Sequence, residues 1–208
     1  MRLDIPNMLL AGSMARNTGK TTFCLAFLDR WKDKFEVIGL KATNAGDGQG
    51  ACRHGNDGCG ACFSFAGNCE IIEETDNSGP KDTQKLLAAG AKKVFWIKAR
   101  SGRLKEALNM VLPEISKDRL IVCESTSLAE IARPGVSVLM SKGGLTQVKP
   151  SAAAFMEKAD FVADVSEPGR LGAVLDQIEV FKGGPGNGLR VSRLNNRFRS
   201  HGRAYPLK

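Results

Sequence analysis

The sequence predicts an α/β fold, in which a mainly parallel sheet forms the middle of three layers. Short apolar runs alternate with helical segments along most of the chain, and a glycine-containing loop joins the first apolar run to the first helical segment. Alternation of this kind is typical of parallel sheets that are covered by helices on both faces. The composition, with 42% hydrophobic and 25% charged residues, is ordinary for one medium-sized globular domain.

The predicted strands are short apolar runs, and the predicted helices carry apolar residues at helical spacing. We expect strands at 8–11, 35–40, 94–97, 120–123, 136–140 and 161–163, and helices at 21–31, 82–89, 104–111 and 151–158. Asp82 or Thr83 is expected to cap the second helix, and Gly90 to end it. In such a fold ligands gather at the carboxyl ends of the strands.

The loop after the first strand ends in Gly19-Lys20-Thr21 and opens a helix. This arrangement predicts a phosphate-binding loop, in which backbone N–H groups and the helix N-terminus face an anion. The expected nucleotide-binding residues are Gly12, Ser13, Met14, Ala15, Arg16, Asn17, Thr18, Gly19, Lys20, Thr21 and Thr22. Lys20 would reach the β- and γ-phosphates, and the Thr21 hydroxyl would bind Mg²⁺.

The loop departs from the consensus spacing at one position. Met14 stands where the pattern G-x-x-x-x-G-K-[ST] has its first glycine, and Gly12 lies two residues earlier. The alternative is a plain glycine turn between a strand and a helix. The strand before the loop and the helix after it favour the phosphate-binding interpretation.

A protein with such a loop also needs a carboxylate near Mg²⁺ or the attacking water. Glu124 directly follows the apolar run 120–123, so it is the candidate, with Lys20 as the other catalytic residue and Thr21 as its partner on Mg²⁺. A glutamate at that place can also be a solvated strand end. Asp47, which follows the second strand, is the reserve candidate.

A cysteine-rich insertion at 43–70 interrupts the alternation of strands and helices. Its cysteines are Cys52, Cys59, Cys62 and Cys69. Thiolates spaced C-x6-C-x2-C-x6-C could form a tetrahedral site for Zn²⁺ or an iron–sulfur cluster, and His54 could replace one of them. A redox pair at Cys59 and Cys62, or reduced cysteines without a role, are the alternatives. Cys24 and Cys123 lie in apolar segments and are expected in the core.

The net charge of +8 belongs mainly to the end of the chain. Residues 183–208 carry +6 and residues 1–182 only +2. The composition predicts a folded domain over 1–182, a flexible linker at 183–188, and then a disordered basic tail. The alternative is an arm that contacts RNA or phospholipid, but nucleic-acid binding is not favoured. The sequence offers no signal peptide and no apolar run long enough to span a membrane, so we expect a cytoplasmic protein.

Taken together, these motifs resemble the molybdopterin-guanine dinucleotide biosynthesis adapter proteins of the MobB type, a P-loop GTPase family. The landmarks, in the family's order, are the Gly19-Lys20-Thr21-Thr22 loop, Lys41 at the end of the second strand, Lys81-Asp82-Thr83, Ala89-Gly90-Ala91 and Glu124. The resemblance implies a P-loop NTPase fold, GTP or ATP binding with Mg²⁺, and a possible homodimer. It also implies a role beside a cofactor-assembly enzyme in building a molybdenum or tungsten cofactor.

The chain departs from that family in ways that predict a relative with its own metal-binding specialisation. The cysteine-rich insertion replaces a histidine-bearing segment, and Ser125 follows Glu124 where the family usually has glycine. The basic tail has no counterpart. A guanine-reading motif is represented only by Ser141-Lys142, so the preference for GTP over ATP comes from the resemblance alone.

The sequence is compatible with three functions. The first is an NTPase that acts in metallocofactor assembly. The second is a small-molecule kinase on the same fold, whose substrate would contact Lys41, Lys81, Asp82 or Thr83. The third is a metal-carrying or metal-sensing protein in which the nucleotide only sets the conformation.

Overall fold

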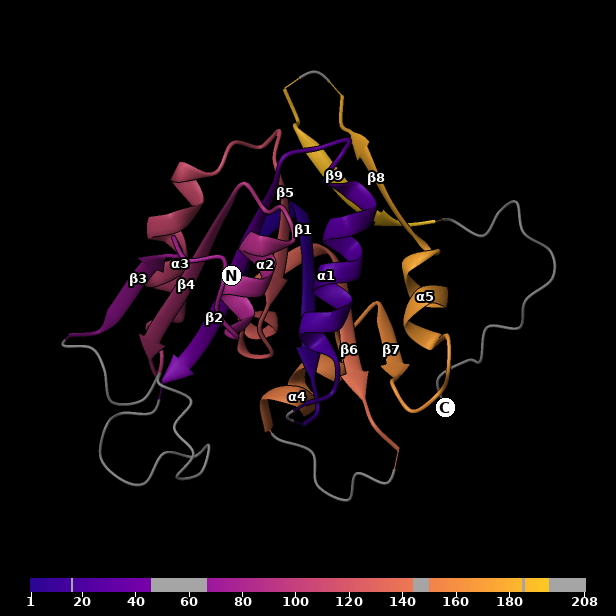
Figure 1. The fold of residues 1–208 in the computed structure, drawn as a ribbon. Helices are drawn as coiled ribbons and strands as arrows, with labels where there is room; N and C mark the ends of the chain where they lie inside the picture. Colours follow the sequence, from indigo (N-terminus) through magenta and orange to yellow (C-terminus); the bar gives the residue numbers. More distant parts are fainter. Residues whose placement is uncertain (16, 46–66, 144–149, 185, 195–208) are drawn as a thin grey trace.

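The computed structural model describes residues 1–15, 17–45, 67–143, 150–184 and 186–194. A seven-stranded sheet in the order β3-β4-β2-β5-β1-β6-β7 forms the centre of the fold (Figure 1). Its strands are β1 (Leu3–Ser13), β2 (Val37–Ala45), β3 (Cys69–Glu73), β4 (Lys93–Arg100), β5 (Leu120–Glu124), β6 (Ala132–Ser141) and β7 (Phe161–Asp164). Among these described strands, β3 at the edge runs antiparallel to its neighbour β4, and the other neighbouring pairs are parallel. The predicted α/β class is confirmed.

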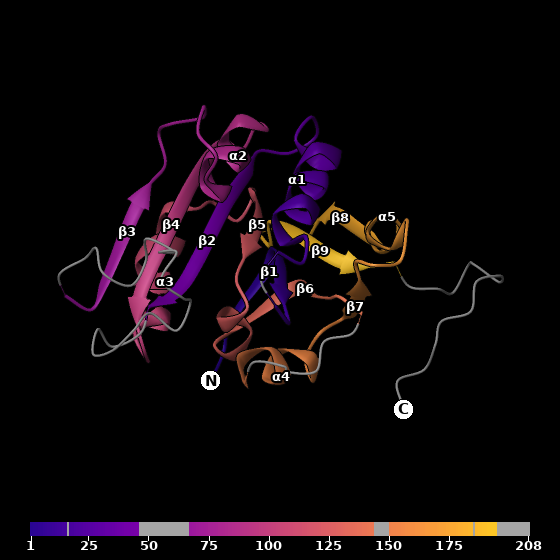
Figure 2. The same ribbon diagram turned by 60° about the horizontal axis from the view of Figure 1, so that its bottom comes forward.

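In the described part of the chain, α-helices and a hairpin cover the two faces of this sheet (Figure 2). The helices are α1 (Lys20–Trp31), α2 (Asp82–Ala88), α3 (Leu104–Val111), α4 (Pro150–Met156) and α5 (Arg170–Leu175), and the hairpin consists of β8 (Ile178–Lys182) and β9 (Leu189–Arg193). One face packs against α1, α2, α5 and the hairpin, and the other against α3 and α4. The result is the expected three-layer arrangement.

The central strand β1 shows why the sheet is buried on both faces. Met8 and Leu10 join the apolar cluster on the α3 and α4 side, whereas Leu9 and Ala11 join the cluster on the opposite side. All four are inaccessible to solvent. A continuous apolar run is therefore what a parallel strand with two covered faces requires.

The end of the folded domain differs from the prediction. Residues 189–193 were expected in a disordered tail, but they form β9, which pairs with β8 and packs against β1 and β6. Leu189 and Val191 are buried and alternate with more exposed residues, so one side of β9 faces the core. The glycines before it form the hairpin turn, in which Gly188 has φ +65°. The remaining residues of the predicted tail, 195–208, lie outside the described part of the chain.

Most of the cysteine-rich insertion also lies outside the described residues, including Cys52, His54, Cys59, Cys62 and Asp47. Cys69 is described, half-buried at the start of β3 and opposite Ala99 of β4. Within the described ranges no group of three or more histidine, cysteine, aspartate or glutamate side chains could hold a metal ion. These residues give no support to a zinc or iron–sulfur site.

Cys24 and Cys123 are buried in the core, as predicted. Burial raises the pKa of both thiols, which keeps them protonated and unreactive. None of the helices in the described ranges has the length and apolar character that a membrane crossing requires.

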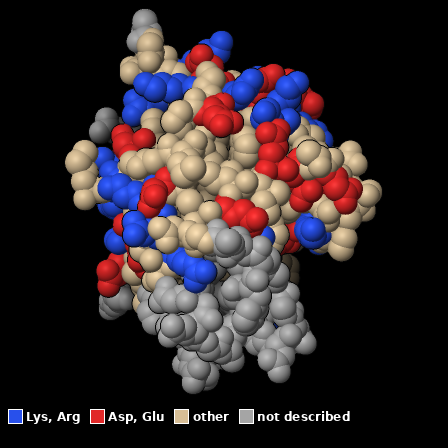
Figure 3. Space-filling model, turned by 90° about the vertical axis from the view of Figure 1, so that its left-hand side faces the viewer, with Lys and Arg blue, Asp and Glu red and all other residues tan. Residues whose placement is uncertain are grey.

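Charged side chains of both signs are interspersed on the face that includes the β3 edge (Figure 3). Two ion pairs join the edge strand β3 to its neighbour β4, between Lys98 and Glu70 at 3.0 Å and between Lys93 and Glu73 at 3.2 Å. Like charges are therefore not gathered into one large patch on this side of the sheet.

Candidate functional site

The loop between β1 and α1 makes a tight turn that is fixed by its own side chains. The Ser13 and Thr18 hydroxyls both donate to the carbonyl oxygen of Ala15, at 2.7 Å and 3.1 Å. Asn17 and Gly19 have positive φ angles of 53° and 79°. This conformation suits glycine and is tolerated by asparagine, so the chain can turn sharply before α1 begins at Lys20.

Gly12 and Met14 have packing roles that the loop motif did not reveal. Gly12 lies in β1, and a Cβ atom there would come within 2.1 Å of the Phe155 ring of α4. Met14 is buried and donates its N–H to the Met140 carbonyl. Its φ is not positive, so glycine is not needed at the position where the consensus has one. Neither residue lines the cleft described below, and Arg16 lies outside the described residues.

Lys20 points along the loop toward the end of β5. Its Nζ donates to Ser13 Oγ at 2.8 Å and lies 3.9 Å from Glu124 Oε1. Burial lowers the pKa of Lys20, and the Glu124 carboxylate partly offsets that effect. The ammonium group is thus held mainly by a neutral hydroxyl.

Glu124 is the last residue of β5, where register places it opposite Ala11 of β1 and Lys41 of β2. The side chain is buried, and its surroundings raise its pKa. Burial contributes most and the nearby Asp82 carboxylate adds to it, whereas Lys41 and Lys20 act in the opposite direction. The placement that the sequence predicted for Glu124, at a strand end beside the loop, is what the structure shows.

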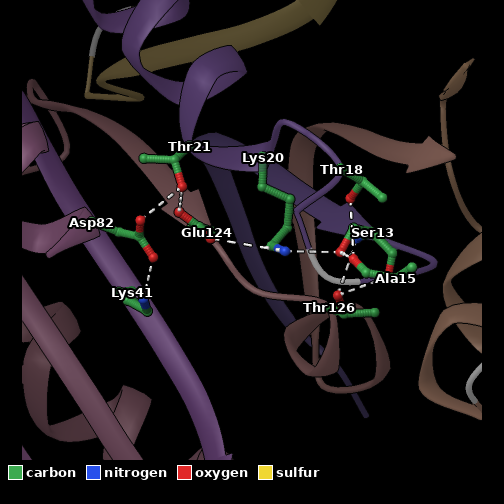
Figure 4. Close-up of polar contacts among 9 residues, drawn as sticks. All are labelled: Ser13, Ala15, Thr18, Lys20, Thr21, Lys41, Asp82, Glu124 and Thr126. Carbon is green, nitrogen blue, oxygen red and sulfur yellow. Dashed lines mark hydrogen bonds and ion pairs between the residues drawn. The ribbon is translucent and has the colours of Figure 1, made fainter. Parts of the chain in front are cut away.

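Thr21 joins this carboxylate to a second one. Its Oγ1 lies 2.9 Å from Glu124 Oε2 and 3.1 Å from Asp82 Oδ1, and its single proton can be donated to either (Figure 4). The other oxygen of Asp82 accepts from Lys41 Nζ in an ion pair. Burial alone would raise the pKa of Asp82, but the hydrogen bond and charge of Lys41, together with Thr21, bring it below the usual value.

The start of α2 separates the three consecutive residues of the Lys81-Asp82-Thr83 motif. Lys81 is the N-cap residue, and its N–H donates to Gln84 Oε1 at 3.0 Å. Thr83 is buried and donates to Glu74 Oε2 at 2.7 Å. The expectation that Asp82 or Thr83 caps the helix is therefore wrong. Of the predicted substrate contacts, Lys41 and Asp82 line the cleft and Lys81 and Thr83 do not.

A cleft of about 690 Å³ opens at these residues. Its lining comes from the loop and α1 (Ser13, Ala15, Asn17, Thr18, Gly19, Lys20, Thr21, Thr22), from β2 (Lys41, Ala42, Thr43, Asn44), from α2 and β4 (Asp82, Lys85, Trp96) and from the segments after β5 and at α4 (Glu124, Ser125, Thr126, Ser127, Ser151).

Several of these lining residues were not found from the sequence. Trp96 pairs with Lys41 in the sheet, and Lys41 pairs with Glu124, so the three lie in one row across neighbouring strands. Thr126 Oγ1 accepts from the Ser13 N–H at 3.1 Å and so fixes the start of the loop. The strand order was the missing information, because it decides that Lys41, in the middle of β2, lies between Trp96 of β4 and Glu124 at the end of β5.

The donor set at the carboxylates fits a small hard cation. One hydroxyl and two carboxylates converge at Thr21, and Mg²⁺ is bound in proteins by a few such oxygens together with water and phosphate. Beside them lie a lysine and the N-terminus of a 12-residue helix, which together favour an anion. The arrangement can therefore hold a phosphate group next to a divalent cation.

No protein-family model matches the sequence, and a search of curated proteins finds no match either. Among solved structures, the chain is similar to LpxK from Aquifex aeolicus, which was crystallised in complex with ATP. The identity is 14% over 78% of this chain, with a TM-score of 0.46. The match covers 49% of LpxK, so this chain spans about half of its length.

Proposed function

We propose that the chain binds a nucleoside triphosphate with Mg²⁺ in this cleft and hydrolyses it. The observation that carries the proposal is the convergence of Lys20, Thr21 and Glu124 beside the turn that opens α1. Phosphoryl transfer requires a loop and a lysine that bind the phosphates, and a hydroxyl and a carboxylate that bind Mg²⁺. The base is proposed to be guanine because of the MobB resemblance, with ATP as the alternative ligand.

Each residue has a distinct role in this proposal. The amides of the loop and the Lys20 ammonium bind the β- and γ-phosphates, and Lys20 exchanges its contact with Ser13 for a phosphate oxygen. Thr21 and Glu124 hold Mg²⁺, and the geometry adds Asp82 as a third oxygen ligand. When bound, Mg²⁺ neutralises charge that develops on the phosphates. Lys41 keeps Asp82 in position and ionised.

The binding step is tested with a fluorescent nucleotide analogue, GTP-based and ATP-based, titrated in the presence of Mg²⁺. Lys20→Ala removes a charge-assisted contact with phosphate, so affinity should fall by at least about tenfold. Lys92→Ala is the matched control, since Lys92 is an exposed lysine just before β4, at the opposite end of the sheet. Equal affinity of the wild type and Lys20→Ala would contradict the assignment of the loop.

The hydrolysis step is tested by phosphate release at saturating nucleotide. Glu124→Gln keeps the shape of the side chain but removes its charge, so Mg²⁺-dependent turnover should fall while the protein stays folded. Glutamine at this position also removes the cost of burying a charged carboxylate, so the variant should be no less stable than the wild type. A loss of turnover would therefore not result from destabilisation of the core. Full turnover in Glu124→Gln would reject the role of Glu124.

We further propose that this activity serves the assembly of a metallocofactor, as an adapter beside a cofactor-assembly enzyme. The support is the MobB resemblance and the spacing of Cys52, Cys59, Cys62 and Cys69, which suits Zn²⁺ or an iron–sulfur cluster. The test is the metal content of protein purified without oxygen. The variant Cys59→Ser/Cys62→Ser should lose a stoichiometric metal that Cys24→Ala retains. Absence of metal from the wild type would remove this part of the proposal.

A second candidate function, transfer of the terminal phosphoryl group to a small molecule, is favoured by the extent of the cleft. Its lining continues past Asp82 to Lys85 and Trp96, beyond the residues that a triphosphate needs. In that reaction an acceptor oxygen bonds to the terminal phosphorus as its bond to the β–γ bridging oxygen breaks. The nucleoside diphosphate leaves with the electron pair, and the acceptor proton passes to solvent. A phosphorylated product would distinguish transfer from hydrolysis.

A third candidate, a metal carrier whose conformation the nucleotide sets, rests on the cysteine spacing alone. It predicts a labile metal whose affinity changes when nucleotide binds. A metal that does not exchange would count against it.

A further inference from the structure

We propose that the outer half of the cleft binds a second small molecule that carries an anionic group and a flat ring. This outer half is defined by Lys41, Thr43, Asn44, Asp82, Lys85 and Trp96. The inference deepens the proposed function, because it assumes that the nucleotide fills the inner half, formed by the loop and α1. It names the chemical class of the molecule that would lie beside the terminal phosphate.

The two halves of the cleft come from different parts of the fold. The inner half is a backbone turn that suits phosphates, whereas the outer half consists of side chains from β2, α2 and β4. Neighbouring strands are about 4.8 Å apart, so Trp96 and Glu124, which flank Lys41 on either side, are separated by roughly 10 Å. A molecule with one ring and one anionic group can span that distance.

The charges of the outer half favour an anion. Of the six residues, Asp82 alone has a carboxylate. One of its oxygens accepts a hydrogen bond from Lys41, and the other lies within hydrogen-bonding distance of the Thr21 hydroxyl. The Lys85 ammonium makes no direct hydrogen bond or ion pair among the described residues, although its charge acts on Asp82, and Lys85 is exposed at the cleft. A ligand anion would give Lys85 a direct charge-assisted contact, which Asp82 does not provide.

Trp96 provides a rigid surface for a ring. Its Nε1–H donates to Thr43 Oγ1 at 3.1 Å, which fixes the orientation of the indole on the sheet. The side chain is only partly buried and lines the cleft. The Lys41 and Lys98 ammonium groups lie 5.7 Å and 4.3 Å from the ring centroid and hold it further. An aromatic side chain fixed in this way favours stacking or edge contact with a planar group.

The experiment follows the two indole N–H signals of the full chain by NMR, with phenyl phosphate as the probe. Trp31→Phe assigns the signals, because the chain has two tryptophans. The inner half is first saturated with a non-hydrolysable triphosphate and Mg²⁺. Phenyl phosphate should then shift the Trp96 signal in a saturable way and leave the Trp31 signal in place. Inorganic phosphate has the anionic group without the ring, and phenol has the ring without the anionic group. Each should bind at least about tenfold more weakly than phenyl phosphate.

Lys85→Ala should weaken phenyl phosphate binding by about tenfold, the effect of one charge-assisted contact, while Lys92→Ala should leave it unchanged. A Trp96 signal that does not move, or an affinity that is the same in Lys85→Ala, would overturn the inference. If the triphosphate does not bind but the Trp96 signal still responds to phenyl phosphate, the nucleotide proposal fails. The proposal of a binding site in the outer half of the cleft is then still supported. The two proposals can therefore fail separately.

Discussion

Replacing Gly12 by alanine tests whether this glycine serves packing or phosphate binding. The new Cβ would lie 2.1 Å and 2.4 Å from two carbons of the Phe155 ring. Carbon atoms in contact are normally about 3.5–4.0 Å apart, so more than an ångström is missing. Phe155 is fully buried, and its ring cannot turn out into solvent. Overpacking of this kind costs about 1–3 kcal/mol, and we expect the free energy of unfolding to fall by that amount.

Urea denaturation followed by circular dichroism measures the effect. Gly172→Ala is the matched control, because Gly172 lies in α5 and a Cβ there would have no neighbour within 4 Å. Alanine is a better helix former than glycine by about 0.5–1 kcal/mol, so this variant should be as stable as the wild type or slightly more stable.

The pair Gly12→Ala and Phe155→Leu separates overpacking from other causes. If the alanine clashes with the ring, the smaller leucine relieves the clash, and the double variant loses less stability than the sum of the single variants. Strictly additive losses, or a Gly12→Ala variant as stable as the wild type, would refute the packing argument. Because Gly12 lies in β1 rather than in the turn, the double variant should also keep its nucleotide affinity.

The remaining predictions concern the charged cluster and the end of the fold. Asp82→Asn should weaken Mg²⁺-dependent nucleotide binding by about tenfold, whereas Lys81→Ala should leave it unchanged, as titration calorimetry would show. The raised pKa of Glu124 means that its contribution to stability is fully present below the ordinary value of 4.5 and is lost as the pH rises through the folded-state value. Without Mg²⁺, Glu124→Gln should therefore gain stability relative to the wild type at pH 7 but not at pH 4, measured by urea denaturation. A chain that ends at residue 182 should be destabilised by several kcal/mol, because it loses the buried side chains of β9, whereas a chain that ends at residue 194 should keep the stability of the full chain.

The sequence was sufficient for the features that depend on local pattern. Apolar runs alternating with helical segments predicted the class of the sheet, and the loop motif placed Lys20 and Thr21 at the start of a helix. Glu124 could be found because a polar residue directly after an apolar run lies at a strand end. Each of these inferences uses residues that are close together in the chain.

The features that were missed depend on distant residues meeting in space. Asp82 reaches Lys41 and Thr21 only because α2 begins at the carboxyl edge of the sheet, and a capping motif gives no sign of that placement. The strand β9 is short, and its two buried residues are too few for a periodic pattern to stand out against the neighbouring arginines and glycines. These two side chains are buried because β9 packs against β1 and β6, which are far from it in the sequence.

The two lysines of the cluster differ in a way that points to different roles. Lys41 is held directly by Asp82, so moving it would leave a half-buried carboxylate without its partner. Lys20 contacts a neutral hydroxyl and lies 3.9 Å from Glu124, beyond hydrogen-bonding distance, so it can turn to a phosphate at little cost. Ion pairs that are removed from water rarely add net stability, and a purely structural role explains this cluster poorly. We therefore expect Lys20→Ala to weaken nucleotide binding with and without Mg²⁺, and Lys41→Ala to act chiefly on the Mg²⁺ dependence through Asp82.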